Sequence, residues 1–298
     1  MGEKVYVETM IEAPIETLWE YTQSPHLHQQ WDLRFSEILY LPKEKEEDRQ
    51  KFLYRTAIGF GISIAGEGES YGTRERDGIR TSTLKFGTDQ RLSLIREGSG
   101  FWRYVPDGEG VIFLTQYDYR TRYGLAGRLL DRLVFRPLMG WATAWSFDAL
   151  KLWLEKGIHP ASSLYRFIRM LLIRVVLGLL WMYQGLVPKL LVPDSGEMEL
   201  ISQFSFLAGY ERAVLTGMGI AEIVFGLWLL CCRGRKLHYL NLALLAALLL
   251  SGLASPAIYV APFNPVTLNL AMMALSALYV LEREPAPSAK HCIRKPKN

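Results

Sequence analysis

The pattern of apolar and polar positions divides this chain of 298 residues into two halves with different periods. Over residues 1–157, short runs alternate between apolar and polar residues, which is typical of half-buried β-strands. Beyond about Arg166 there are four long apolar stretches, at 167–187, 213–232, 237–260 and 266–281. Each is close to the roughly 20 residues that a helix needs to cross a bilayer. The pattern predicts a soluble domain followed by a four-helix transmembrane bundle.

The alternating half predicts one strand, two short helices and then a run of antiparallel strands. The first strand covers 5–11, and short helices are expected after Pro14 and Pro25, since proline suits the first turn of a helix. Gly and Asp at Asp77-Gly78 and Asp107-Gly108 favour tight reversals between strands. The later strands are expected at 36–41, 51–57, 62–67, 78–86, 91–97, 100–105 and 111–120.

A long helix is predicted to close the soluble half. Pro137 interrupts the helical pattern from 128 to 156, so we expect a bend there and a final helix from about Pro137 to Lys156. Apolar residues recur at spacings of three and four, which predicts a single apolar stripe facing the core. The stripe consists of Leu130, Val134, Leu138, Trp141, Trp145, Ala149 and Leu152.

This order of elements resembles the START/polyketide-cyclase-like (SRPBCC) superfamily over about residues 3–157. Ala13-Pro14 before the first helix, Trp31 after the second, and the long last helix carry the resemblance. It implies an α+β helix-grip domain, in which a curved antiparallel sheet wraps the long C-terminal helix and leaves an apolar cavity for lipids or other apolar ligands. The expected cavity residues are Trp31, Phe60, Trp102, Tyr104, Phe113, Tyr117, Trp141 and Trp145. The alternative is that these aromatic residues simply fill the core.

Charge predicts the orientation in the membrane. Residues 1–157 hold 21 Lys and Arg against 23 Asp and Glu, and residues 158–298 hold 13 against 7, so the net charge of +4 comes from the second half. The clusters of basic residues beside the apolar stretches all fall on one side, which the positive-inside rule assigns to the cytoplasm. We expect a multi-pass protein of the cell membrane with the soluble domain and both termini cytoplasmic. Residues 285–298, rich in Pro and Lys, are expected to be a disordered basic tail.

Polar residues inside the predicted helices form a second candidate site. Glu222 lies near the middle of the second apolar stretch, where a carboxylate is costly unless it is paired or protonated. Counting along antiparallel helices places Arg174 about one turn to its cytoplasmic side and Gln184 one turn to its outer side. One interpretation is that Glu222 accepts protons or binds a substrate. The other is that Glu222 makes a structural polar contact that fixes the register of neighbouring helices. The predicted intramembrane cluster is Arg174, Trp181, Gln184, Lys189 and Glu222.

The membrane half, about residues 163–283, resembles the DoxX-like family. The motifs are the block from Trp181 to Lys189, the step from Gly219 to Glu222, and Pro262-Phe263-Asn264-Pro265. The block from Arg136 through Phe147 resembles proteins that fuse a START-like domain to such a bundle. The resemblance implies domains at 1–157 and 158–284, and relatives that include subunits of membrane oxidoreductases passing electrons to quinone.

The sequence favours binding over catalysis. It shows no Ser–His–Asp grouping, no Gly-rich phosphate loop, no cysteine cluster and no paired membrane histidines for haem. The rings of His26 and His28 would point apart on a helix, so no metal is predicted, and neither half has the basic face of a nucleic-acid binder. We expect a non-catalytic protein without a cofactor that binds the bilayer and an apolar small molecule or lipid. The alternatives are a subunit of a quinone-linked oxidoreductase and a scaffold that recruits a protein partner or a second copy.

Overall fold

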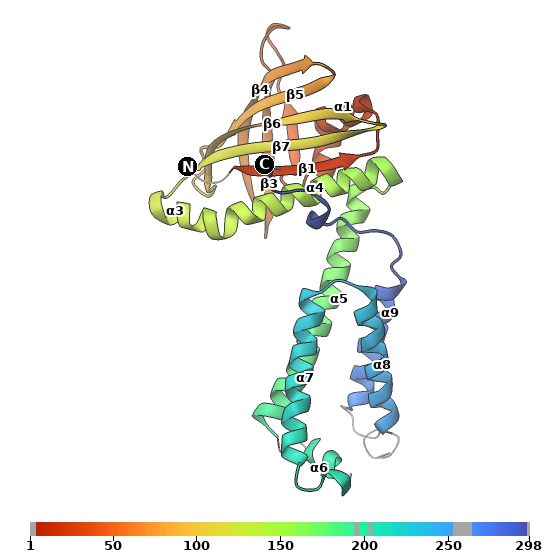
Figure 1. The fold of residues 1–298 in the computed structure, drawn as a ribbon. Helices are drawn as coiled ribbons and strands as arrows, with labels where there is room; N and C mark the ends of the chain where they lie inside the picture. The colour runs from red at the N-terminus through yellow and green to blue at the C-terminus, as the bar shows by residue number, and fades with distance from the viewer. Residues whose placement is uncertain (1–3, 194–196, 203–204, 253–263, 297–298) are drawn as a thin grey trace. The chain divides into compact units, whose positions relative to one another are not determined.

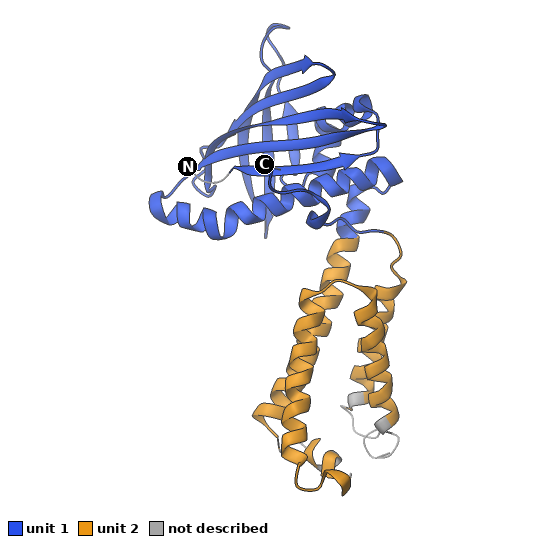
Figure 2. Cartoon of the chain, in the orientation of Figure 1, with its two compact units in different colours: residues 1–165, 285–298 blue, residues 166–284 orange. Residues whose placement is uncertain are grey.

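The chain folds into two compact units in the computed structural model, which describes residues 4–193, 197–202, 205–252 and 264–296. Unit 1 combines residues 1–165 with 285–298, and unit 2 covers 166–284 (Figure 2). The segments before and after unit 2 therefore belong to the same folded body.

Unit 1 is built on a seven-stranded antiparallel sheet with the order β1-β7-β6-β5-β4-β3-β2 (Figure 1). Only β1 pairs out of sequence, because helices α1 (Ile15–Gln23) and α2 (Pro25–Trp31) carry the chain from β1 to the opposite edge. This is the predicted helix-grip order. The strands are β1 Val5–Ile11, β2 Glu37–Tyr40, β3 Lys51–Gly59, β4 Ile62–Arg76, β5 Ile79–Gly87, β6 Ile95–Asp107 and β7 Gly110–Thr121.

The two strands predicted at 91–97 and 100–105 are wrong as separate elements, because β6 begins at Ile95 and continues without a break through the second, while residues 91–94 precede it. The intervening glycines suggest a turn in the sequence, but they serve close approach within the sheet. A Cβ on Gly98 would lie 2.5 Å from the Phe86 ring, and one on Gly100 would lie 2.4 Å from the Cβ of Tyr117. Glycine here makes room for a neighbouring aromatic residue, the ring of Phe86 at Gly98 and the Cβ of Tyr117 at Gly100.

The long helix after the sheet is confirmed, but its apolar stripe is only half buried. Helix α3 (Gly124–Leu130) leads through a π-helical turn, η1 (Asp131–Phe135), into α4 (Arg136–Lys156), with Pro137 in the first turn of α4. Trp145, Ala149 and Leu152 are buried, whereas Leu130, Val134 and Leu138 are more than half exposed. A π-helical turn changes the rotation per residue, so the face that precedes it no longer continues the face that follows.

The prediction of a disordered tail at 285–298 is wrong for its described part, residues 285–296. Ala289 and Cys292 are buried in the main core, and Glu8 and Ile293 exchange two backbone hydrogen bonds of 2.9 Å. Asp148 on α4 accepts hydrogen bonds from the Ser288 amide and His291. Local composition favours disorder here, but partners distant in sequence hold the segment.

Unit 2 is helical. Helix α5 (Pro160–Leu186) starts in unit 1 and continues into a π-helical turn, η2 (Val187–Leu191). The other elements are α6 (Glu197–Ser202), η3 (Ser205–Leu207), α7 (Glu211–Cys231), α8 (Arg235–Gly252) and α9 (Pro265–Leu281). Helix α5 with η2, and helix α7, are long and apolar enough to cross a membrane, while the apolar part of α9 is shorter. Residues 253–260 of the third predicted stretch, and 262–263 of the predicted turn, lie outside the described residues.

Candidate functional site

Most of the aromatic residues predicted to line a cavity instead pack against one another. Trp31, Trp102, Tyr104 and Phe113 are buried in one core cluster, and Trp141 packs against it. Phe113 stacks on Phe147 of α4 with ring centroids 4.4 Å apart. Trp145 and Tyr117 are also buried, and the Tyr117 hydroxyl lies 2.9 Å from that of Thr143. This part of the inner face is a filled core.

Phe60 contradicts the cavity prediction outright. It lies in the tight turn between β3 and β4 with a positive φ of 52° and its side chain is fully exposed. Its position in a hairpin turn keeps it away from the inner face of the sheet.

A second group of rings, which the sequence analysis missed, covers the part of the inner face formed by β3, β4 and β5. Phe52, Tyr54 and Phe86 are only partly buried, unlike the core residues above. Each ring lies over a glycine of a neighbouring strand: a Cβ on Gly68 would be 2.2 Å from the Phe52 ring, and one on Gly66 2.4 Å from Tyr54. We call Phe35, Phe52, Tyr54 and Phe86 the aromatic inner surface. The available signal was the alternation of aromatic residues in one strand opposite glycines in the next.

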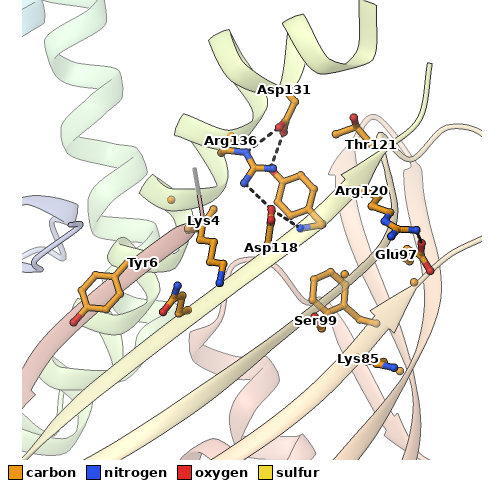
Figure 3. A pocket seen from close by; sticks show the side chains of 18 of the residues that line it. Lys4, Tyr6, Lys85, Glu97, Ser99, Asp118, Arg120, Thr121, Asp131 and Arg136 are labelled. Carbon is orange, nitrogen blue, oxygen red and sulfur yellow. Dashed lines mark hydrogen bonds and ion pairs between the residues drawn. The ribbon is translucent and has the colours of Figure 1, made fainter. Parts of the chain in front are cut away.

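A broad depression of about 2210 Å³ lies at the end of the sheet that holds Phe52 and Phe86 (Figure 3). Its lining includes Gly68 and Gly98 of the inner face, together with charged residues of the outer face. None of the eight predicted cavity residues lines it. Because both faces of the sheet contribute, the depression is open and is not a chamber enclosed between the sheet and α4.

Charged residues form a cross-strand row on the outer-face side of this depression. The row consists of directly paired positions on β3, β4, β5, β6 and β7, and it alternates in charge as far as Lys85. Opposite charges facing each other across strands stabilise pairing modestly. The residues are Lys51, Glu69, Lys85, Ser99 and Asp118.

Arg136 fixes the helical side of the depression to the sheet. Its guanidinium lies 2.9 Å from Asp131 and 3.0 Å from Asp118, and it stacks 4.4 Å from the centre of the Tyr119 ring (Figure 3). The Tyr119 hydroxyl donates to Asp131 at 2.7 Å. Burial and this hydrogen bond to a carboxylate raise the pKa of Tyr119 well above its usual range. The phenol is therefore a fixed donor at neutral pH.

A buried ion pair lies beside the aromatic inner surface. The side chain of Asp32 is fully buried, and its two oxygens accept from Arg34 at 2.8 and 2.6 Å. His28 approaches the same carboxylate at 3.0 Å. The Arg34 guanidinium lies 5.5 Å above the Tyr117 ring and 5.6 Å above Phe35. The ion pair therefore contacts both the filled core, through Tyr117, and the aromatic inner surface, through Phe35.

The electrostatics of this cluster follow from burial and pairing. Burial acts to raise the pKa of Asp32, but the Arg34 guanidinium outweighs it and holds the pKa well below its usual range. Burial lowers the pKa of His28, and Asp32 offsets this only in part. Among the described residues, no group of three or more His, Cys, Asp and Glu side chains is placed to hold a metal. The sequence signal was an acid and a base two residues apart, directly after Trp31.

The predicted intramembrane cluster is divided in the structure. Lys189 lies 2.9 Å from Glu222 and 2.8 Å from Glu197, and its ammonium donates to the Gln184 carbonyl at 3.3 Å. The contact with Glu222 is an ion pair without the directionality of a hydrogen bond. Beside it, the glycines of α5 and α7 meet, since a Cβ on Gly185 would be 2.4 Å from a carbonyl oxygen of α7.

Arg174 and Trp181 belong to other contacts. Arg174 donates to the Leu229 carbonyl at 3.1 Å and to that of Leu230, so it caps the end of α7 and does not pair with Glu222. Trp181 donates to Asn241 at 2.7 Å.

Asn241 opens a polar network on α8 and α9 that the sequence analysis missed. Asn241 donates to Ser276 at 2.7 Å, His238 lies 3.4 Å from the same hydroxyl, and the His238 ring stacks 3.7 Å from Tyr279. All four residues are buried. The signal was His238 and Asn241 three residues apart, on one face of a helix.

The two units define a membrane protein that carries a helix-grip domain, and the family comparison agrees with the predicted DoxX-like resemblance. A model of the DoxX-like family matches residues 178–277. The chain is 48% identical over 233 residues to the uncharacterized membrane protein YndG of Bacillus subtilis (strain 168), and the match covers 76% of each chain. This protein belongs to the same membrane-protein family as YndG.

Solved structures similar to unit 1 come from several bacteria. A STAR-related lipid transfer protein from Xanthomonas axonopodis is 15% identical, with a TM-score of 0.40, over 50% of this chain and 85% of that one. A hypothetical protein from Helicobacter pylori is 15% identical, with a TM-score of 0.41, over 51% and 88%. The Zhui aromatase/cyclase from Streptomyces sp. R1128 is 15% identical, with a TM-score of 0.36, over 46% and 87%.

Proposed function

We propose that unit 1 binds an apolar small molecule or lipid, without catalysis, against the aromatic inner surface. The observation that carries this proposal is the partial burial of Phe52, Tyr54 and Phe86 on the same sheet face whose other part is a filled core. Two of these rings line the depression, where a ligand would complete their burial. Burying a ring surface from water is favourable by about 25 cal/mol per Å². The rings favour a flat or greasy ligand.

The ion pair beside the rings indicates what kind of ligand this is. Two of the three guanidinium nitrogens of Arg34, Nε and one Nη, donate to Asp32, so the carboxylate balances the charge of Arg34. Its face covers Phe35 and Tyr117 and holds them in position. Such a site favours a ligand whose uncharged portion lies against the rings. Its polar groups would then face the charged residues on the outer-face side of the depression.

The proposed topology is a multi-pass arrangement with the soluble unit and both termini in the cytoplasm. The support is that residues 1–165 and 285–298 form one folded body, so the chain enters and leaves the membrane on the same side. The number of crossings is then even. Helices α5 and α7 account for two, and α8 and α9 bring the number to the predicted four if both cross. The basic residues at 233, 235 and 236 favour the cytoplasmic side.

Mass spectrometry of solvent extracts tests the ligand proposal. Full-length protein would be purified in native-lipid discs, alongside the double variant Phe52→Ser/Phe86→Ser. The matched control is Ile58→Ser, which removes an exposed apolar residue outside the depression. We expect an apolar compound enriched over bulk lipid in the wild type and the control, and lost from the double variant. Extracts of the wild type that contain only bulk lipid would contradict the proposal.

The quinone-linked alternative depends on Glu222 as a proton acceptor. The pairing of Glu222 with Lys189, beside two helices in close contact, favours the role of fixing helix register. We expect Glu222→Gln to lower the thermal midpoint of the full-length protein in discs and to leave bound quinone unchanged. A folded variant with an unchanged midpoint that loses quinone would support the oxidoreductase. Recruitment of a protein partner and assembly with a second copy stay predictions.

A further inference from the structure

Helix α3, the π-helical turn η1 and the first turn of α4 carry an apolar face that the rest of unit 1 does not cover. Six large apolar side chains along it are between 52% and 78% exposed, although soluble surfaces usually avoid such contiguous patches. We call this set the exposed leucine face. It consists of Leu125, Leu129, Leu130, Leu133, Val134 and Leu138.

The face has the sidedness of an amphipathic helix. Side chains four residues apart lie on one side of a helix, so this segment divides into rows. Gly127 and Asp131 form the row buried against the sheet. Leu125, Leu129 and Leu133 form the opposite row, with Leu130, Val134 and Leu138 next to it. Arg128 and Arg132 run along the other flank, and both are exposed.

Contacts on the opposite side of this helix keep the leucines from being buried in unit 1. Asp131 is buried and held by Tyr119 and Arg136, and these contacts fix its side of the helix to β7. One turn earlier, a Cβ on Gly127 would lie 1.8 Å from the Arg122 carbonyl oxygen, so the helix backbone touches the chain that leads into it. The leucines therefore stay outside the core for a structural reason.

The charge around the face is positive. Asp131, the sole acid in the sequence from 121 to 140, is buried and paired with Arg136. Beyond Arg128 and Arg132, a hollow of about 580 Å³ at the start of α3 is lined by Arg91, Arg96 and Arg122. A helix with apolar side chains on one face and arginines on its flank matches a bilayer surface that contains anionic headgroups.

Two covalent connections join unit 1 to the apolar helices of unit 2. Helix α5 runs from unit 1 into unit 2 without a break, and α9 ends at Leu281 while unit 1 resumes at Pro285. Three residues span at most about 10 Å when fully extended. Unit 1 is therefore covalently joined at two points to helices, two of which, α5 with η2 and α7, are long and apolar enough to cross a membrane, and a bilayer around them is an extensive apolar medium available to the leucines.

We propose that the exposed leucine face lies in the headgroup region of an anionic bilayer. The leucines contact the acyl boundary, and Arg128 and Arg132 contact lipid phosphates. Both arginines also line the large depression, so docking brings the depression to the membrane surface. An apolar ligand then passes between bilayer and protein with little exposure to water.

Nitroxide labels at single cysteines test this docking in the full-length protein. Labels would be placed by Leu129→Cys and by Leu133→Cys in a background where the exposed Cys231 and Cys232 are serine, while the buried Cys292 stays. The matched control is Ile58→Cys, because Ile58 is 57% exposed and Leu129 60%. Discs would contain phosphatidylcholine alone or mixed with phosphatidylglycerol. We expect the labels at 129 and 133 to gain access to oxygen and lose access to a water-soluble nickel reagent, most strongly in the anionic discs. The label at 58 stays accessible to nickel.

The arginines supply a second measurement. Arg128→Gln/Arg132→Gln should remove the difference between the two kinds of disc while the protein stays folded. Labels at 129 and 133 as accessible to nickel as the label at 58, in both kinds of disc, would overturn the proposal. Protection that persists in detergent and rises with protein concentration would overturn it too, since a second copy would then cover the face. Ligand retention in the same discs is a separate readout, so failure of the ligand proposal is distinguishable.

Discussion

The inner face of the sheet has two halves with similar composition and different packing. On β6 and β7, Trp102, Tyr104 and Phe113 are buried, and Phe113 stacks directly on Phe147 of α4. On β3 and β5, Phe52 and Phe86 lie over glycines and remain partly exposed. Aromatic content alone therefore does not identify a binding surface. What distinguishes the second half is that its rings are only partly buried.

The largest expected effect comes from truncating the filled half. Phe113→Ala removes a fully buried ring that contacts three others, so it should lower the free energy of unfolding by about 3–5 kcal/mol. Urea titration of the full-length protein in discs, followed by near-ultraviolet circular dichroism, measures this loss. A loss near that of Phe86→Ala would show that the two halves pack alike.

The next effect comes from the ion pair between the halves. Asp32→Asn leaves Arg34 without its counter-charge and should cost about 3 kcal/mol, at the low end for breaking a buried pair because Arg34 retains some solvent contact. The same titration measures the loss, and Arg34→Lys is the conservative control. An unchanged midpoint would mean that solvent already screens the pair.

The same pair predicts a pH dependence. The pKa of Asp32 is depressed in the folded state, so its stabilisation is present above the unfolded value of about 3.9 and is lost as pH falls toward the folded value. Wild type should therefore lose stability below about pH 4, and Asp32→Asn should lose less over that interval. Parallel curves for the two proteins would contradict the assignment.

A smaller effect is expected from filling the space under an open ring. Gly98→Ala places a Cβ 2.5 Å from the Phe86 ring and 2.9 Å from the Asp118 carbonyl oxygen, and overpacking of this kind costs about 1–3 kcal/mol. Adding Phe86→Ala should recover part of the loss, because the ring clash disappears while the backbone contact stays. Simple additivity of the two substitutions would argue against the ring lying over this glycine.

The smallest effect on stability, and a large one on binding, is expected for Phe86→Ala. The ring is partly buried, so truncation should cost only about 1 kcal/mol. The loss of ligand from extracts should nevertheless match that of the double variant. If Phe86→Ala retained as much ligand as the wild type, the Phe86 ring would not take part in binding.

Much of the candidate site escaped sequence analysis for a physical reason. Alternation correctly placed Phe113 and Tyr117 on one face of β7, because side chains alternate along any strand. Alternation could not distinguish rings that α4 covers from rings that it leaves uncovered, because this depends on where the helix crosses the sheet. Lys189, four residues after Gly185, pairs with Glu222, whereas helical counting had favoured Arg174 or Gln184. Which side chain reaches the carboxylate depends on how α5 and α7 pack against each other.

The sequence by itself determined the division into two units, the helix-grip order of elements, and the positions of the long helices, because these depend on local periodicity and on proline and glycine. Only the tertiary structure decided which rings stay open, that residues 285–296 join unit 1, and that the leucines of α3 and η1 face outward. Each of these depends on partners distant in sequence, such as Asp148 for the tail and Tyr119 for η1. Periodicity sets which side chains share a face, and long-range contacts set what that face meets.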